Sequence, residues 1–380
     1  MPIQAAHPSF PRAHNGMMRD WPDRRLLDLL NIEIPIIQAP MAGSDSVALA
    51  RGVSSAGGLG SLACALLAPD AVRDAARALR DGLDRPFNLN FFCHTMGTPG
   101  EAARERWKAN LRTHYERLGL DIEAVPETRL RLPFNEEMCA AVEEIRPEVV
   151  SFHFGLPAPE LVERLKARGI RILSSATSAR EARWLEERGC DAIIVQGFEA
   201  GGHRAMFLET DAATQVGLFA LLPQVADAVS IPVIATGGIG DARGIVAAFA
   251  LGASGVQMGT AYLFCSEAKV SPVYRRALEQ VNDTGTAITN LFSGRPARGI
   301  VNRYLSESGP MSDAALAFPH AATLVAPLRA ASEKAGSPDY LQMWAGQAAA
   351  LAQSMPADQL TRKLAADALR LLSRTRSAER

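Results

Sequence analysis

The chain has 380 residues, of which 48% are hydrophobic and 21% charged, and its formal net charge is −1 at pH 7. This composition is typical of a folded protein and excludes a largely disordered chain. The near-zero charge predicts no nucleic acid or anionic membrane as partner. The five cysteines are scattered without metal-ligand spacing, so we expect neither a disulfide framework nor a metal site, and we expect a reducing, cytoplasmic location.

The N-terminal residues 1–24 are predicted to be a lead-in to the folded domain. They carry Pro, His, Asn and Arg but no hydrophobic stretch of the kind found in secretion signals. No apolar run in the chain approaches the roughly 20 residues that a membrane helix needs. The sequence therefore predicts neither secretion nor membrane insertion.

Eight short apolar segments read as strands, and most are followed by a segment with helical spacing. They cover residues 34–40, 59–64, 87–92, 148–155, 171–175, 192–197, 231–238 and 255–260. Such alternation requires parallel strands joined by right-handed crossovers. Eight units over roughly 230 residues predict an α/β fold of the (β/α)8 TIM-barrel type, with an open doubly wound sheet as the alternative.

Helical segments between these strands are marked by their apolar period and by Pro, Gly and Asp near their ends. They include residues 44–56, 69–83, 159–168, 178–188, 214–229 and 241–251. Asp241 is placed as the N-cap of the last of these helices.

Two regions depart from the barrel rhythm. Residues 93–135 contain a charged helical segment at 101–118 and read as an insertion after the third strand. Strand signals fade after residue 270, and residues 314–372 are rich in Ala and Leu with helical period. We therefore expect a barrel over residues 25–270 and a mainly helical region over 271–380, which forms with the insertion a second lobe over the barrel mouth.

Glycines follow three late strands, at Gly201-Gly202, Gly237-Gly238 and Gly259-Thr260. Barrels often bind phosphate after the seventh and eighth strands through backbone N–H groups, although such glycines can also simply form tight turns. No Gly-Lys-Ser/Thr arrangement follows them, which excludes a P-loop, and no carboxylate cluster suggests Mg²⁺. A phosphate-bearing cofactor or substrate held by backbone is the remaining prediction.

Side chains at other strand ends suggest what that phosphate belongs to. Asn90 and Gln196 each offer a hydrogen-bond donor and acceptor to the edge of a planar heterocycle, which suits flavin mononucleotide (FMN). His153 ends the fourth strand and is a candidate acid or base, although a structural histidine between two phenylalanines is an equal alternative. His203 could neighbour the phosphate or belong only to its loop.

With these residues in view, the sequence resembles the nitronate monooxygenases, formerly 2-nitropropane dioxygenases, of the FMN-dependent β/α-barrel superfamily. Similarity covers about residues 34–264, and the matching stretches are residues 38–43, 151–157, 196–203, 232–239, 252–253 and 258–260. The stretch His153-Phe154-Gly155 favours class I of this family over the related NADH:quinone reductases and flavin-dependent enoyl reductases. Phe198 departs from a residue that is often small or polar, and Ala205 stands where a further Gly is common.

The resemblance implies a role for each matched residue. Pro40, Met41 and Asn90 would contact the ring side of FMN, and Gln196 would bind the cofactor. His153 would be the catalytic residue, either abstracting the α-proton of a nitroalkane or binding the nitro group. The phosphate would be held by Gly201, Gly202, Gly237, Gly238, Gly259 and Thr260.

The implied activity is the oxidation of alkyl nitronates, such as propionate 3-nitronate, and of nitroalkanes by O₂ to a carbonyl compound and nitrite, without NAD(P)H. Its partners would be the nitronate and O₂, and a homodimer is left open. The alternatives are a quinone or enoyl reductase of the same superfamily and, in another class, a phosphate-ligand-binding barrel without redox chemistry.

Overall fold

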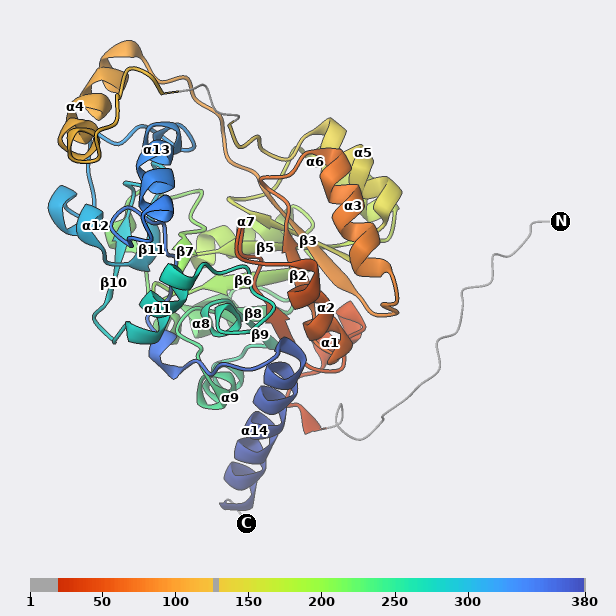
Figure 1. The fold of residues 1–380 in the computed structure, drawn as a ribbon. Coiled ribbons are helices and arrows are strands. Elements are labelled where there is room, and N and C mark those ends of the chain that lie inside the picture. The colour runs from red at the N-terminus through yellow and green to blue at the C-terminus, as the bar shows by residue number, and fades with distance from the viewer. Residues whose placement is uncertain (1–19, 126–129, 379–380) are drawn as a thin grey trace.

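The structure is a computed structural model that describes residues 20–125 and 130–378, and an eight-stranded parallel sheet lies at its centre (Figure 1). The order of the strands is β1-β9-β8-β6-β5-β4-β3-β2. The two edges of the sheet also meet, because Leu59, the residue before β2, pairs with Ile37 of β1. Gln38 N donates to Leu59 O at 2.9 Å, and Leu59 N donates to Ile36 O at 3.0 Å. The sheet is thus closed into a barrel, and the open-sheet alternative is excluded.

All eight predicted strands are present. They are β1 (Ile36–Gln38), β2 (Gly60–Ala63), β3 (Phe87–Phe92), β4 (Val149–His153), β5 (Arg171–Ala176), β6 (Ala192–Gln196), β8 (Val233–Thr236) and β9 (Gly255–Met258). Nearly every residue of these strands is buried, because the inner face fills the barrel and the outer face contacts helices. Their apolar runs therefore predicted them correctly.

Helices on the outside complete the barrel. They are α1 (Arg25–Leu30), α2 (Val47–Ser55), α3 (Pro69–Arg80), α5 (Glu136–Ile145), α6 (Pro159–Ala167), α7 (Ala179–Glu187), α8 (Leu218–Ala226), α9 (Ala242–Ala250) and the short α10 (Thr260–Leu263). The predicted cap is confirmed, because the Asp241 carboxylate accepts a hydrogen bond from Arg243 N at 2.9 Å. The helix expected over residues 214–229 is shorter than predicted, because Gly217 starts α8 and residues 212–214 form the 3₁₀ turn η2 (Ala212–Thr214).

The insertion and part of the C-terminal region form the predicted second lobe. Helix α4 (Glu101–Arg117) of the insertion lies beside α13 (Ala321–Lys334), and α12 (Arg303–Ser308) completes the group (Figure 1). Trp107 and Tyr115 of α4 share a buried apolar cluster with Leu324 of α13, separate from the barrel core. The Tyr115 hydroxyl also donates to Leu324 O at 2.5 Å. Two segments far apart in sequence thus share one core.

A small antiparallel sheet was not predicted. It consists of β7 (Gly202–His203), β10 (Thr286–Thr289) and β11 (Ala297–Ile300), in the order β10-β11-β7. These strands are too short to show an alternating pattern, and β7 is formed by a Gly-rich loop. The sheet joins the region after residue 270 to the loop that follows β6.

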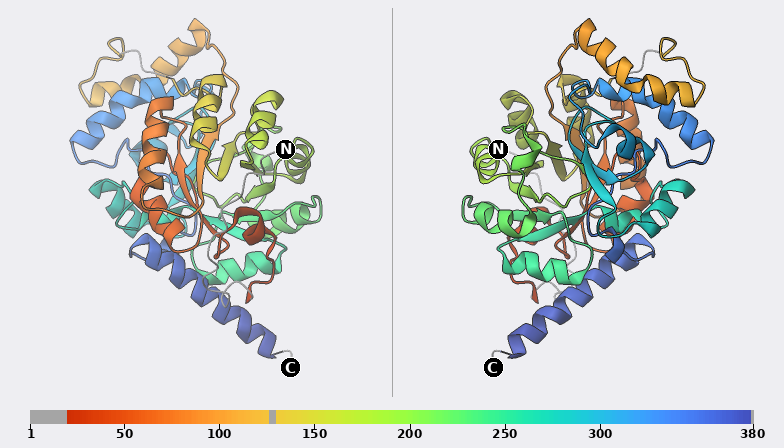
Figure 2. Two further views of the ribbon diagram at one scale, coloured as in Figure 1. Left: turned by 90° about the vertical axis from the view of Figure 1, so that its right-hand side faces the viewer. Right: turned by 90° about the vertical axis from the view of Figure 1, so that its left-hand side faces the viewer.

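The remaining helices of the C-terminal region lie outside the second lobe and closer to the barrel. They are α11 (Pro272–Gln280), the 3₁₀ turn η3 (Ala349–Leu351) and α14 (Ala357–Ala378). Helix α14 packs on α2 and α9, and its far end extends beyond the barrel (Figure 2). Within the described residues, no helix combines the length and the hydropathy needed to cross a membrane.

Candidate active site

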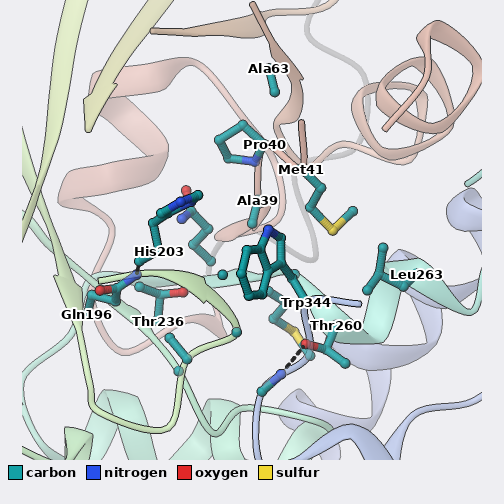
Figure 3. A pocket seen from close by; sticks show the side chains of 18 of the residues that line it. Ala39, Pro40, Met41, Ala63, Gln196, His203, Thr236, Thr260, Leu263 and Trp344 are labelled. Carbon is teal, nitrogen blue, oxygen red and sulfur yellow. Dashed lines mark hydrogen bonds between the residues drawn. The ribbon is translucent and has the colours of Figure 1, made fainter. Parts of the chain in front are cut away.

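A cleft of about 1350 Å³, measured out to its open mouth, lies at the carboxyl ends of the barrel strands. Every predicted site residue lines it: Pro40, Met41, Asn90, His153, Gln196, Gly201, Gly202, Gly237, Gly238, Gly259 and Thr260. Figure 3 shows Pro40 and Met41 on one side of the cleft and Gln196 and His203 on another.

Backbone makes up much of the wall at the ends of β8 and β9, where glycines line the cleft. Gly237 and Gly238 have φ values of 106° and 68°, which favour glycine. A Cβ atom on Gly201 would lie 2.5 Å from Gly346 N, so the loop after β6 touches the C-terminal region too closely for any side chain. Thr260 Oγ1 accepts a hydrogen bond from Gly346 N at 2.9 Å, which leaves its hydroxyl proton free for a ligand (Figure 3). This cradle suits an anion such as phosphate.

Polar side chains that suit a heterocycle lie on other walls. The Asn90 Nδ2 group donates to Ser151 O at 3.1 Å and to Ser151 Oγ at 2.9 Å, so its N–H donors are engaged by β4 and Oδ1 is the atom that can accept from a ligand. Gln257 was not predicted; its Oε1 atom is buried without a hydrogen-bond partner within the described part of the chain. A buried acceptor of this kind calls for a donor from a ligand. A ring that carries an N–H group, such as that of a flavin, therefore fits this wall.

The carbonyl oxygen of His203 positions two of the predicted residues. It accepts hydrogen bonds from Gln196 Nε2 at 3.0 Å and from the His153 Nε2 atom at 3.2 Å. Gln196 Oε1 also accepts from Ala205 N at 2.8 Å. The His203 ring itself is buried, bonded to Ser293 Oγ at 2.9 Å, and burial holds its pKa well below the usual value. His203 thus positions its neighbours.

The protonation of His153 follows from its partners. Because a carbonyl oxygen can only accept, Nε2 carries the proton, and Nδ1 accepts from Ser175 Oγ at 3.2 Å. Burial, with smaller contributions from the nearby Arg295 and Arg204, lowers the pKa of His153 to about 3. The imidazole is therefore neutral at ordinary pH and is a weak base. Ser175, which also lines the cleft, was not selected from the sequence.

The unusual Phe198 has a structural explanation. Two guanidinium groups lie near its ring, with Arg298 Cζ at 4.9 Å and Arg204 Cζ at 5.8 Å from the ring centroid. Arg204 also donates to Gly197 O at 2.7 Å and Gln196 O at 2.9 Å, and Arg298 donates to Phe198 O at 3.0 Å. The two arginines fix the backbone that leads from β6 into the cleft.

A buried carboxylate fixes the loop that carries Pro40 and Met41. Asp45 Oδ2 accepts from Met41 N at 3.0 Å and from Ala63 N at 2.8 Å, which ties the end of β1 to the end of β2. Burial raises the pKa of Asp45 to about 6. Asp45 is absent from the cleft lining, so its role is to hold the loop in place.

Several lining residues come from outside the predicted motifs. Gln342, Trp344, Gly346 and Ala348 belong to the C-terminal region, and Arg131 belongs to the insertion. The Trp344 ring lies 5.5 Å from the His203 ring, and Figure 3 shows it at the centre of the cleft. No strand precedes these residues, so the strand-end rule could not select them. A signal was present for Ser175, the last residue of the strand predicted over 171–175, and for Gln257, which lies in the strand predicted over 255–260.

Comparisons with known proteins agree on one family. A family model described as nitronate monooxygenase matches residues 23–367. A Paraburkholderia phytofirmans protein named nitronate monooxygenase is 42% identical over 347 residues, covering 90% of this chain and 94% of its own. A Pseudomonas aeruginosa protein of the same name is 42% identical over 350 residues, covering 90% and 97%.

Solved structures give a similar result. The structure of nitroalkane oxidase from Streptomyces ansochromogenes superposes with a TM-score of 0.84 at 38% identity, covering 94% of this chain and all of that one (100%). FabK from Thermotoga maritima has a TM-score of 0.69 at 28% identity, covering 93% and 98%.

Proposed function

Because the chain belongs to the nitronate monooxygenase family, whose members are flavin-dependent oxidoreductases, we propose that it oxidises alkyl nitronates with O₂ to a carbonyl compound and nitrite, without NAD(P)H. The observation that carries this proposal is the cleft itself. It combines a backbone cradle at the ends of β8 and β9 with a neutral histidine at the end of β4.

We propose FMN as the flavin, because the cradle suits one phosphate group. Pro40, Met41 and Asn90 would lie against its ring, and Gln196 and Gln257 would offer hydrogen bonds to it. The phosphate would be held by Gly201, Gly202, Gly237, Gly238, Gly259 and Thr260. A bound flavin supplies the electron acceptor that the oxidation requires.

We propose that the Nε2–H group of His153, which donates to His203 O, turns to the oxygens of the nitronate group when substrate binds. A nitronate has already lost its α-proton, so its oxidation needs no strong base. A histidine whose pKa is about 3 is poorly matched to removing a proton from carbon near neutral pH, because catalysis is most efficient when the pKa lies near the working pH. The site thus favours nitronates over neutral nitroalkanes.

The test is a spectrum followed by an oxygen measurement. The purified protein should be yellow, release FMN on denaturation, and consume O₂ with propionate 3-nitronate while forming nitrite. Rapid flavin reduction by NADH without O₂ would favour the reductase alternative. A protein that stays colourless after FMN is added would overturn the proposal in favour of a binding barrel. The homodimer and the cytoplasmic location stay predictions, which light scattering and cell fractionation test.

A further inference from the structure

Arg131 is the one permanently charged side chain on the wall of the cleft, as far as the described residues show. No Asp or Glu of the described chain lines the cleft, and its other titratable lining residues are His153, His203 and Tyr274. The wall therefore carries a cation and no fixed anion.

The Arg131 guanidinium has no hydrogen-bond or ion-pair partner within residues 20–125 and 130–378. Its contact is the Phe318 ring, whose centroid lies 6.0 Å from Cζ, and the charge that acts on it is that of Arg329. Burial lowers the pKa of Arg131 to about 10, and Arg329 adds to the effect, so the group is still charged at neutral pH. A partly buried cation without a counter-ion is costly, and an anion from outside would relieve that cost.

Arg131 and the phosphate cradle lie on opposite sides of the barrel mouth. Its own carbonyl accepts from His94 Nε2 at 3.0 Å, and Phe134 N donates to Phe92 O at 2.8 Å, so this segment runs beside the end of β3. In the closed strand order, β3 stands opposite β8, which leads into Gly237 and Gly238. The cofactor phosphate and Arg131 thus belong to opposite ends of the cleft.

Space for a substituent exists at this end. Arg131 and Phe92 line both the main cleft and a neighbouring cleft of about 680 Å³, whose other walls include Leu66, Leu132 and Phe134. A group attached to the nitronate carbon could therefore reach the guanidinium without crossing the cradle.

We propose that Arg131 anchors a carboxylate at the end of the substrate away from the nitronate group and so selects nitronates that carry a second negative charge. A guanidinium binds a carboxylate through two parallel hydrogen bonds, and no residue in the described part of the chain occupies the donors of Arg131. The proposal rests on the proposed function, since it concerns the substrate of that same site. Arg131 is a specificity-determining residue in it.

The test compares two nitronates that differ only at this end. Propionate 3-nitronate carries a carboxylate where propyl-1-nitronate carries a methyl group. We expect Arg131→Met to lower the ratio of their kcat/KM values roughly 10- to 100-fold, mainly through KM of the carboxylated substrate, because a hydrogen-bonded charge pair is lost. Arg131→Lys should retain most of the ratio. Arg106→Met, an exposed arginine on α4, is the matched control and should leave the ratio unchanged.

A binding measurement separates this proposal from the proposed function. Succinate and butyrate, titrated into the flavin-bound protein and followed by the visible spectrum, need no turnover. Wild type should bind succinate more tightly than butyrate, and Arg131→Met should not. An unchanged substrate ratio in Arg131→Met, equal binding of both acids by wild type, or loss of flavin from the variant would overturn the assignment. A wild type that prefers succinate but oxidises no nitronate would overturn only the proposed function.

Discussion

The two ends of the cleft differ in whether backbone or side chains line them. At the ends of β8 and β9 the wall is largely backbone, shaped by Gly237, Gly238 and Gly201, and no titratable side chain of the described residues lines it there. At the ends of β3 and β4 the wall is side chains, including His153 and Arg131. One end therefore offers shape and N–H groups, and the other offers charge and chemistry.

This difference suggests how the fold can vary. The backbone end depends on three chain segments that approach too closely for side chains, so substitutions there disturb cofactor binding. The side-chain end draws on the insertion and on the C-terminal region, which are outside the barrel repeat. Residues there can change substrate choice while the cradle stays intact.

The largest expected effect is at the backbone end. Gly201→Val places a side chain where Gly346 N would lie 2.5 Å and Ala345 C 2.6 Å from its Cβ atom, so backbone must move. Since a displacement of about 1 Å can cost roughly 100-fold in rate, we expect kcat/KM to fall at least that far. Flavin content after gel filtration should fall with it.

Gly97→Ala is the matched control, because its Cβ atom would meet nothing within 4 Å and its φ is not positive. It should keep both flavin and activity. A Gly201→Val protein that folds and keeps its flavin would contradict the cradle.

At the side-chain end, His153→Asn should lower kcat/KM roughly 10- to 100-fold, as expected for one hydrogen bond to a charged group. Because the pKa of about 3 makes His153 a weak base, we expect similar losses with a nitronate and with its parent nitroalkane. The measurement is O₂ consumption with both substrates. A loss confined to the nitroalkane would show that His153 removes the α-proton.

Much of this could be predicted because the barrel repeats one pattern. The eight strands are apolar and buried on both faces, so their sequences reveal them, and the strand-end rule then places His153, Gln196 and the glycines at one edge. Asp241 was also placed correctly, because an N-cap is a local signal.

The rest depends on long-range contacts that no local pattern encodes. Strand β7 exists only because β11 pairs with it, and Trp344 and Arg131 reach the cleft from segments without a repeat. The protonated nitrogen of His153 follows from the carbonyl of His203, which lies 50 residues away in the chain. Such contacts form only in the folded chain.

The pH dependence of stability should come from the side-chain end. Burial lowers the pKa of His94 to about 4, whereas the pKa of a histidine in the unfolded chain is about 6.5. Below pH 6.5 the unfolded chain therefore binds a proton that the folded chain does not bind, and the free energy of unfolding decreases as the pH is lowered. We expect His94→Phe to remove about 2 kcal/mol of the change in unfolding free energy between pH 6.5 and 5. Asp45, with its raised pKa, acts in the opposite direction in both proteins and cancels in the comparison. Urea denaturation at several pH values measures this difference, and parallel pH profiles for the two proteins would contradict it.

The smallest expected effect tests whether the hydrogen bond from Ser175 orients the His153 ring. Ser175 Oγ lies 3.2 Å from His153 Nδ1 and is the donor that this nitrogen accepts from. Ser175→Ala removes that neutral hydrogen bond, worth about 0.5–1.5 kcal/mol, so kcat/KM for a nitronate should fall roughly 2- to 12-fold while flavin content is unchanged. Ser174→Ala is the control on the same strand, because Ser174 Oγ bonds Gly155 O at 2.8 Å and is not among the residues that line the cleft. It should lower stability and leave kcat/KM within twofold. If both variants lose activity equally, the effect belongs to β5 packing, and the orientation of His153 does not depend on Ser175.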